Sequence, residues 1–287
     1  MEGKICVITG ANSGLGFETA KALAHRGAIV AMVCRSEEKG KAALIKIAQE
    51  TGNAHLNLFV ADLSSQKSIK EAATKIRNKY PHIDVLVNNA GTWISELTYT
   101  EDKIEKMFAV NHLAYFYMSH LMYPWLKKSA DGRIVSVSSD SHFQTRMHFD
   151  DLFLTKKYHG LRAYAQSKLA NVLFTYELDR IKSEDNISVY AVQPGLVKTD
   201  IGLKHTKWLH AIAWKLRRSG GVTPDIGAKT QIYLATEEDV KGESGKYWDK
   251  CKPKKTSKHS YNQEEWTQLW KVSEELCKID DFFVDSI

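Results

Sequence analysis

Short apolar runs alternate with longer amphipathic stretches along most of the chain. The apolar runs lie at residues 5–8, 28–33, 56–60, 85–87, 133–137 and 187–192. Between them, apolar residues recur at helical spacing, as at 37–51 and 163–181. Strands that alternate with helices in this way predict a parallel sheet with helices on both faces. With a last short strand near 245–248, we expect a three-layer α/β fold around a mostly seven-stranded parallel sheet.

No linker-like segment divides the 287 residues, so we expect a single domain over 1–287. Within it, the segment 203–218 carries apolar residues at helical spacing among lysines and arginines. Such a basic amphipathic segment can be a mobile lid over an apolar substrate, an interfacial membrane helix or a plain packed helix. We favour a substrate lid at about 200–222.

Composition and charge are those of an ordinary soluble globular protein, with 43% hydrophobic and 26% charged residues. The net charge is +6, but no nucleic-acid motif accompanies the basic stretches 215–218 and 246–258, so we expect surface loops there and no nucleic-acid partner. No apolar run approaches the roughly 18 residues of a membrane span, and the first strand begins too early to leave room for a signal peptide. The four cysteines lack metal-site spacing. We expect a cytoplasmic protein without a metal.

A glycine-rich turn joins the first strand to the amphipathic run at 17–25. It reads Gly-Ala-Asn-Ser-Gly-Leu-Gly at 10–16. Glycines let the backbone approach a pyrophosphate, and the free N–H groups at a helix start attract the anion. The Gly-x-x-x-Gly-x-Gly spacing departs from the Gly-x-Gly-x-x-Gly fingerprint, so an ordinary turn remains the alternative. The phosphate-binding candidates are Gly10, Asn12, Ser13, Gly14, Leu15 and Gly16.

The ends of the next three strands suit the rest of a dinucleotide. Arg35 follows the second strand, where NAD-selective sites place an acid, and a guanidinium suits the 2′-phosphate of NADPH. Asp62, beside Leu63, ends the third strand, where its carboxylate could meet an adenine amino group. The fourth strand runs into Asn89, Ala90 and Gly91. Because cofactors bind at the carboxyl ends of parallel strands, we expect a Rossmann-type, doubly wound sheet with an NADP site.

Tyrosine and lysine recur four positions apart, a spacing that places both on one face of a helix. The chain has three such pairs: Tyr99 and Lys103, Tyr123 and Lys127, and Tyr164 and Lys168. A lysine charge beside a phenol lowers the phenol's pKa from about 10 and suits it to general acid-base catalysis. The spacing alone does not choose between the three pairs.

Several short motifs occur together in one order. They are Thr9-Gly10-x-x-x-Gly14-x-Gly16, Asp62-Leu63, Asn88-Asn89-Ala90-Gly91, Asn111, Ser139, Tyr164-x-x-x-Lys168 and Pro194-Gly195-x-Val197-x-Thr199. With them, the chain from Lys4 to about residue 275 resembles the short-chain dehydrogenase/reductase family. The run Tyr-Ala-Gln-Ser-Lys-Leu-Ala-Asn-Val-Leu-Phe at 164–174 is most similar to the retinol dehydrogenase-like group of that family.

The resemblance implies roles for these residues. It selects Tyr164 and Lys168 as the catalytic pair, and both would also contact the cofactor. It favours Ser139 over Ser138 as the hydroxyl that binds the substrate oxygen. It implies that Asn111 holds water in a proton relay behind Lys168, although an asparagine in an apolar helix could also link packed helices. The nicotinamide would lie against Pro194, Gly195, Val197 and Thr199.

We therefore expect an NADP-dependent oxidoreductase that interconverts a carbonyl (aldehyde or ketone) and an alcohol on an apolar substrate such as a retinoid, steroid or lipid aldehyde. The resemblance also implies a homodimer. One alternative is a non-catalytic NADP-binding regulatory protein, which a missing catalytic residue would favour. Another is a peripheral membrane-binding module, which only 203–218 supports.

Overall fold

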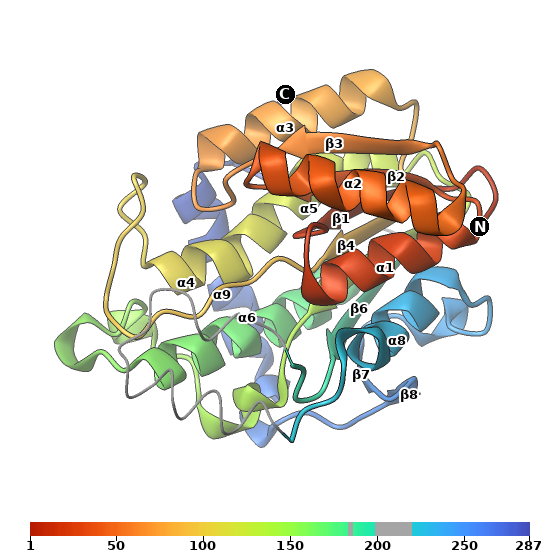
Figure 1. Ribbon diagram of the computed structural model, residues 1–287. Helices are drawn as coiled ribbons and strands as arrows, with labels where there is room; N and C mark the ends of the chain where they lie inside the picture. The colour runs from red at the N-terminus through yellow and green to blue at the C-terminus, as the bar shows by residue number, and fades with distance from the viewer. Residues whose placement is uncertain (183–185, 199–219) are drawn as a thin grey trace.

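The computed structural model describes residues 1–182, 186–198 and 220–287. At its centre lies one sheet with the strand order β3-β2-β1-β4-β5-β6-β7-β8 (Figure 1). The strands are β1 (Ile5–Thr9), β2 (Ile29–Cys34), β3 (Leu56–Val60), β4 (Val85–Asn88), β5 (Gly132–Val137), β6 (Ile187–Gln193), β7 (Lys246–Asp249) and β8 (Lys252–Pro253). The first seven are parallel. The first six form where apolar runs predict them, and β7 forms at the short strand expected near 245–248. The order reverses between β1 and β4, which confirms the doubly wound fold.

The eighth strand departs from the predicted seven-stranded sheet. β8 pairs antiparallel with β7 across a tight turn at Lys250 and Cys251. Both turn residues have positive φ angles, 51° and 58°. Hairpin turns of this kind need a left-handed backbone, which Asn and Gly usually supply. Because neither occurs here, the sequence carries no hairpin signal.

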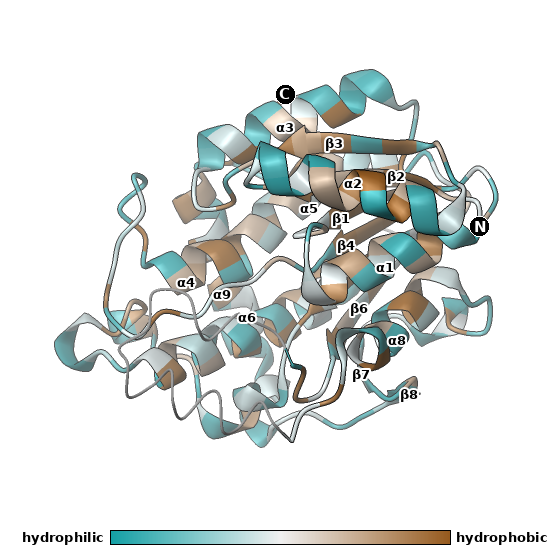
Figure 2. Ribbon diagram, in the orientation of Figure 1, coloured by the Kyte–Doolittle hydropathy of each residue, from teal (hydrophilic) through white to brown (hydrophobic). Residues whose placement is uncertain are grey.

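Helices cover both faces of the sheet, so the fold has three layers (Figure 1). One face is covered by α1 (Gly14–His25), α2 (Glu37–Thr51) and α8 (Pro224–Thr236), and the other by α3 (Gln66–Lys79), α5 (Ala114–Leu126) and α6 (Gly160–Ile181). Side chains of β1 alternate between the two cores. Ile5 and Val7 pack on the side of α5, whereas Cys6 and Ile8 pack on the side of α1. Figure 2 shows apolar strands between helices whose outer faces are hydrophilic.

Shorter helical segments connect these elements. They are α4 (Lys106–Phe108), a π-helical turn (Ala109–Leu113), and 3-10 turns at Asp140–Gln144, Phe149–Asp151, Thr155–Lys157, Lys241–Glu243 and Lys258–Tyr261. The π turn joins α4 directly to α5, and Asn111 lies at its centre. Single π turns inside α-helices are frequent at functional sites. Asn111 therefore lies in a helical segment, as predicted. The periodicity of apolar residues did not reveal that this turn is π-helical.

The C-terminal helix α9 (Gln263–Cys277) packs outside α6. The helix ends at Cys277, and Lys278 caps it in the left-handed conformation. The Trp270 ring lies 5.0 Å from the Phe116 ring of α5, measured between centroids. Phe282, beyond the helix, is buried. The helix and the segment after it therefore cover the outer surface of α5.

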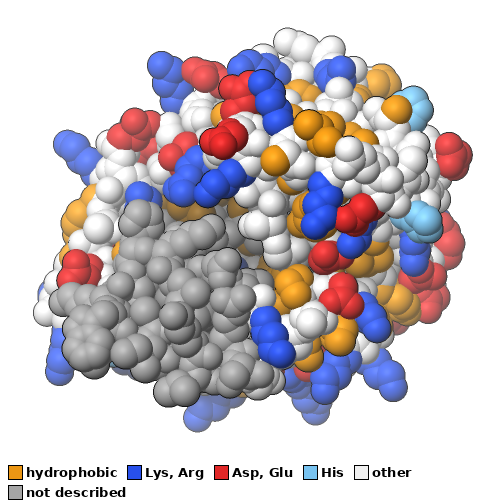
Figure 3. Space-filling model, viewed as in Figure 1, with side chains coloured by type: hydrophobic (Ala, Val, Ile, Leu, Met, Phe, Trp, Pro, Cys, Tyr) orange, Lys and Arg blue, Asp and Glu red, His pale blue; other side chains and the backbone are white. Residues whose placement is uncertain are grey.

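The surface carries charges of both signs. On the face in Figure 3, lysines and arginines lie next to aspartates and glutamates. Across the ranges that the structure describes, no helix is both long and apolar enough to cross a bilayer. In the same ranges, no group of three or more His, Cys, Asp or Glu side chains is arranged to hold a metal ion.

Candidate active site

Two hydrogen bonds join the carboxyl end of β5 to α6. Ser138 Oγ donates to the backbone carbonyl of Lys168 at 2.7 Å, and Lys168 Nζ donates to the carbonyl of Val137 at 2.9 Å. Ser139 follows directly, so the strand end predicted to carry a catalytic serine lies against the helix predicted to carry the tyrosine and lysine. α6 begins at Gly160, one turn before the predicted 163. A Cβ on this residue would lie only 2.6 Å from the carbonyl oxygen of Ile94. Only a glycine fits that approach.

The Tyr164 and Lys168 side chains lie on the same face of α6, with Nζ 5.8 Å from the centroid of the tyrosine ring. The other two candidate pairs differ. Lys103 lies outside any helix, with φ of 60°. Tyr123 is buried inside α5, where its ring contacts Phe282 at 5.6 Å between centroids. Only the Tyr164 pair therefore combines a helix with a position beside a strand end.

Lys168 is a buried cation without a carboxylate partner in the described parts of the chain. Its ammonium has the Val137 carbonyl as acceptor, and the ring of Tyr115 lies 5.4 Å away. Burial lowers the pKa of Lys168 from 10.5 to about 7. The side chain is consequently balanced between its charged and neutral forms near neutral pH, which suits a group that assists proton transfer.

The two neighbouring serines have different surroundings. Ser138 is buried, and its proton is committed to the α6 backbone. Ser139 is half-buried. Among the described residues, its Oγ forms hydrogen bonds only with the adjacent turn, donating to Ser141 Oγ at 3.1 Å and accepting from the Ser141 N–H at 3.2 Å. Of the two, Ser139 is therefore the one whose hydroxyl can turn toward a substrate.

The Asn111 side chain is fully engaged by its neighbours. Its Oδ1 accepts from the Thr92 N–H at 2.7 Å, and its Nδ2 donates to the Thr92 carbonyl and to Ser167 Oγ, both at 3.0 Å. These bonds fasten the segment after β4 to the π turn and to α6. The side-chain geometry thus matches the interpretation in which Asn111 links packed elements.

The glycine-rich turn is closely packed against the end of β4. Gly10 has φ of 70°, and a Cβ on Gly16 would lie 2.4 Å from both Asn89 Nδ2 and the Gly10 carbonyl oxygen. Asn89 Nδ2 also donates to the Thr9 carbonyl at 2.8 Å. Ser13 is the N-cap residue of α1 but makes no side-chain capping bond, so it leaves the first N–H groups of the helix uncapped. This geometry fits a pyrophosphate at the start of α1, as predicted for 10–16.

The other predicted cofactor residues line the same edge of the sheet. Arg35, at the end of β2, is exposed and forms no ion pair with any described residue. Asp62 Oδ1 accepts from the Ser64 N–H at 2.9 Å and from Ser64 Oγ at 2.7 Å, while Leu63 is buried. Ala90 and Gly91 follow β4, and the Ala90 N–H donates to Thr9 Oγ1 at 3.0 Å.

The segment after β6 returns toward the start of α1. Gly195 takes a positive φ of 81°, and its N–H donates to Gln193 Oε1 at 2.8 Å. A Cβ on Gly227 of α8 would lie 2.6 Å from Val197 and 2.8 Å from Leu15, so this glycine lets the two predicted cofactor residues approach one another. Pro194 is half-buried. Thr199 and most of the predicted lid fall on 199–219, outside the described residues.

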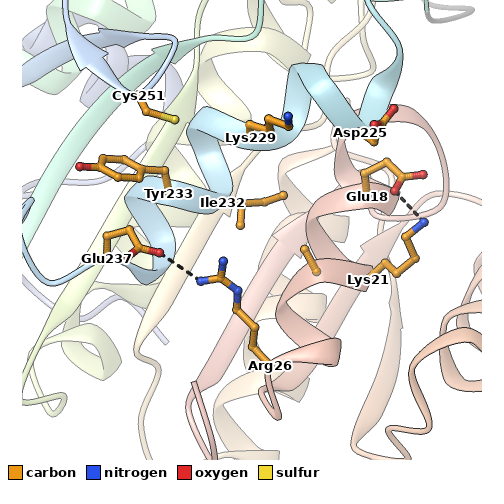
Figure 4. Close-up of a pocket in the computed structure, with 10 residues that line it drawn as sticks. Glu18, Lys21, Arg26, Asp225, Lys229, Ile232, Tyr233, Glu237 and Cys251 are labelled. Carbon is orange, nitrogen blue, oxygen red and sulfur yellow. Dashed lines mark hydrogen bonds and ion pairs between the residues drawn. The ribbon is translucent and has the colours of Figure 1, made fainter.

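A separate groove of about 390 Å³ lies between α1 and α8 (Figure 4). Four of its charged side chains form two ion pairs, Lys21 with Glu18 at 2.8 Å and Arg26 with Glu237 at 3.2 Å. None of the predicted catalytic or cofactor residues lines it. The groove is therefore not part of the candidate site.

Comparison with known proteins identifies the family. The family described as short chain dehydrogenase matches residues 4–210. The chain is a short-chain dehydrogenase. Human retinol dehydrogenase 13 is 40% identical to this dehydrogenase over 97% of the chain and 86% of its own length. Mouse retinol dehydrogenase 12 is 38% identical over 96% of the chain and 87% of its own length. The chain thus belongs to the retinol dehydrogenase-like group.

Solved structures of other proteins share the fold. An uncharacterised protein from Mycobacterium paratuberculosis aligns with a TM-score of 0.77 at 30% identity, covering 97% of this chain and 94% of the other. A short chain dehydrogenase from Escherichia coli CFT073, complexed with NADPH, aligns with a TM-score of 0.71 at 25% identity, covering 87% and 97%. Both comparisons confirm the Rossmann-type architecture.

Three residues of this dehydrogenase site were not among the sequence candidates. Thr9 Oγ1 accepts from the N–H groups of Asn89 and Ala90 and so joins β1 to the end of β4. Tyr115 donates from its hydroxyl to the Ala90 carbonyl at 2.8 Å. Asn171, one turn beyond Lys168, contacts the same Val137 carbonyl. Two of them left a signal in the sequence. Thr9 stands in the glycine-rich motif, and Asn171 is an amide in the apolar stripe of a helix, which requires a reason, as it does at 111.

Proposed function

We propose that the protein is an NADP-dependent oxidoreductase that interconverts a carbonyl and an alcohol on an apolar substrate such as a retinoid, steroid or lipid aldehyde. The observation that carries the proposal is the buried Lys168 ammonium beside Tyr164, next to the strand end with Ser139. The names of its relatives, retinol dehydrogenases, support an alcohol or aldehyde with a large apolar body.

When bound, the nicotinamide cofactor would give or accept the hydride, which is chemistry that no side chain supplies. The close-packed turn 10–16 would hold its pyrophosphate, and Arg35 would pair with a 2′-phosphate. Neighbouring structures complexed with NADP or NADPH support this choice of cofactor. The remaining contacts would come from Asp62, Leu63, Asn89, Ala90, Gly91, Tyr164, Lys168, Pro194, Gly195, Val197 and Thr199.

The protein's own residues move the proton. In the reductive direction Tyr164 donates its phenolic proton to the substrate oxygen as the carbonyl carbon becomes tetrahedral, and Ser139 donates a hydrogen bond to the same oxygen. The Lys168 cation stabilises the phenolate that remains. Asn111 would support the path by which Tyr164 recovers a proton through Lys168. The oxidative direction runs through the same groups in reverse.

The surroundings of Tyr164 support an apolar substrate. Its ring packs against a small cluster of buried apolar side chains, together with the half-buried Tyr158. The cluster consists of Trp93, Ile94, Met107, Leu154 and Ala163. A substrate that reaches the phenol from this side would exchange water for hydrocarbon, and that favours apolar molecules.

Tyr164→Phe tests the reaction. We expect turnover to fall roughly 10²- to 10⁴-fold while NADPH still binds, because only the proton donor is lost. The assay follows NADPH oxidation with retinals, steroids, quinones and aliphatic aldehydes as substrates. Tyr176→Phe on the same helix is the control, since its hydroxyl contacts Thr256 instead. Retained turnover in Tyr164→Phe would sink the catalytic assignment, and NADPH binding without turnover in the unmodified protein would support a regulatory role.

Arg35→Ala tests the cofactor preference. Loss of a charge-assisted contact to a 2′-phosphate should raise the KM for NADPH roughly 10- to 100-fold and leave the KM for NADH unchanged. Arg26→Ala is the matched control, because this arginine pairs with Glu237. A protein that prefers NADH before any substitution would overturn the argument from Arg35.

Quaternary structure and cellular location stay predictions. Light scattering on the purified protein tests the homodimer, and a monomer would remove it. Imaging of the tagged protein in cells tests the cytoplasmic location.

A further inference from the structure

A buried polar chain lies behind Lys168, and Asn171 is its centre. Asn171 Nδ2 donates to the Asn111 carbonyl at 2.8 Å and to the Val137 carbonyl at 3.2 Å, and the residue is fully buried. The Val137 carbonyl is also the acceptor of Lys168 Nζ, at 2.9 Å. The amide of Asn171 therefore fixes the oxygen that positions the Lys168 ammonium.

The two carbonyls also fix the orientation of the Asn171 amide. Since both are acceptors, the NH₂ group must face them, and Oδ1 must face the opposite side. There Oδ1 lies 3.3 Å from His112 Nδ1. An oxygen cannot donate, so His112 must carry its proton on Nδ1.

The assignment continues to α9. Burial lowers the pKa of His112 to about 3, so its ring is neutral at physiological pH and Nε2 is an acceptor. Ser273 Oγ lies 3.0 Å from Nε2 and 2.7 Å from the Leu269 carbonyl, and its single proton can serve only one of them. The orientation of Asn171 therefore sets the tautomer of His112, whereas Ser273 Oγ can donate to the Leu269 carbonyl or to Nε2.

We propose that Asn171 is a positioning residue for the reaction. Its amide holds the Val137 and Asn111 carbonyls in place for Lys168, and the same two carbonyls fix the orientation in which its Oδ1 faces His112. The expected effects of Asn171 on kcat and on the pH–rate profile rest on the proposed function, whereas the expected tautomer of His112 does not. Asn111 and Lys168, which direct contacts do not join, are connected through this one side chain.

The first test measures the tautomer of His112 by ¹⁵N NMR of the unmodified protein. We expect the Nδ1–H form, with Nε2 unprotonated. A predominant Nε2–H form would overturn the proposed orientation of Asn171. This measurement needs neither substrate nor a variant, so its result is independent of whether the proposed activity exists.

The second test compares Asn171→Leu, which keeps the volume but has no amide, with Thr175→Val. Thr175 is equally buried on the same helix, and its Oγ1 donates to the Asn171 backbone carbonyl at 3.0 Å. We expect Asn171→Leu to lower kcat roughly 10- to 100-fold by misplacing Lys168, and to shift the midpoint of the pH–rate profile. Thr175→Val should lose stability without either change.

In Asn171→Leu, His112 should also change to the Nε2–H form, because Ser273 can then donate to Leu269 and accept from His112. A folded Asn171→Leu with kcat and pH profile within twofold of the unmodified protein would refute the positioning role. If this variant does not fold, Asn171→Ala replaces it, since it also removes both Nδ2 hydrogen bonds, and an unchanged kcat and pH profile there would refute the positioning role. If Tyr164→Phe keeps its activity, the proposed function itself is wrong. That outcome is distinct from a failure of the positioning role of Asn171.

Discussion

The two ends of the same parallel sheet hold buried charges in opposite ways. At the amino end, the Asp84 carboxylate accepts hydrogen bonds from Lys4 Nζ at 3.0 Å, the Ile5 N–H at 2.8 Å and Ser129 Oγ at 2.6 Å. His82 Nε2 lies 3.1 Å from the same carboxylate. At the carboxyl end, the Lys168 ammonium has the single acceptor described above and no carboxylate among the described residues.

The pKa values show what the difference does. Burial pushes the pKa of Asp84 up, but the hydrogen bonds from Ser129 and Ile5 and the charge of Lys4 outweigh it, so the pKa lies below its usual range. Burial alone acts on Lys168 and lowers its pKa to about 7. Folding therefore favours the charged form at the amino end and disfavours it at the carboxyl end. The buried Lys168 ammonium is thus kept at a cost in stability. Its lowered pKa suits a role in proton transfer.

Lys168→Met should have the largest effect, because it removes the buried ammonium at the carboxyl end of the sheet. We expect turnover to fall by roughly 10²- to 10⁴-fold, since the cation beside Tyr164 is lost. The same substitution should raise the free energy of unfolding at pH 7 by ~2–4 kcal/mol, because an unpaired buried ammonium is removed. Urea denaturation without cofactor measures the stability. If Lys168→Met is less stable than the unmodified protein, the buried Lys168 ammonium does not lower the free energy of unfolding.

The pH dependence isolates the contribution of Lys168. Its pKa is about 7 in the folded protein and near 10.5 when exposed, so between these values the unfolded chain binds more protons than the folded one. The stability of the unmodified protein should therefore rise relative to Lys168→Met as pH increases from 7 to 10. A constant difference across that window would contradict a depressed pKa.

Asp84→Asn should give the opposite pattern at the other end of the sheet. We expect the variant to lose ~2–4 kcal/mol of stability, since the network loses its charge and part of its acceptors, while kcat stays within twofold. The stabilisation by Asp84 is present above its unfolded pKa of about 3.9 and is lost as pH falls through the lower folded value. Asp239→Asn, at a carboxylate that accepts from Tyr233, is the control. A large loss of kcat in Asp84→Asn would mean that the Asp84 network at the amino end of the sheet affects the active site at the carboxyl end.

Sequence patterns predicted the parts of this fold that local residues determine. The apolar runs marked six of the seven parallel strands, because the strands in the middle of such a sheet are covered on both faces. The β7–β8 hairpin was missed, since Lys250 and Cys251 adopt a backbone that their residue types disfavour. The π turn at Ala109–Leu113 was missed as well, because apolar spacing does not separate it from an α-helix.

The candidate site was predictable as a set of motifs but not as a network. Family resemblance supplied Ser139, Tyr164 and Lys168, and the structure brings the strand end and the helix together. The contacts of Asn171 and Asp84 could not be predicted, because each joins segments far apart in the chain. Asp84 lies in a short link before β4, where an acid is unremarkable until its three donors from two other segments are seen.

The smallest expected effects sharpen the account of the amino end. Ser129→Ala removes a buried donor to Asp84 and should cost ~1–2 kcal/mol, because the carboxylate cannot replace it with water. Lys4→Met removes the ion pair, but the Lys4 side chain is 41% exposed, so the loss should stay below ~1 kcal/mol. Urea denaturation of both variants measures the order. If Lys4→Met lost more stability than Ser129→Ala, the charge of Lys4 and not the buried hydrogen bond would stabilise Asp84. The buried ion at the amino end would then have a single dominant partner, as Lys168 does at the carboxyl end.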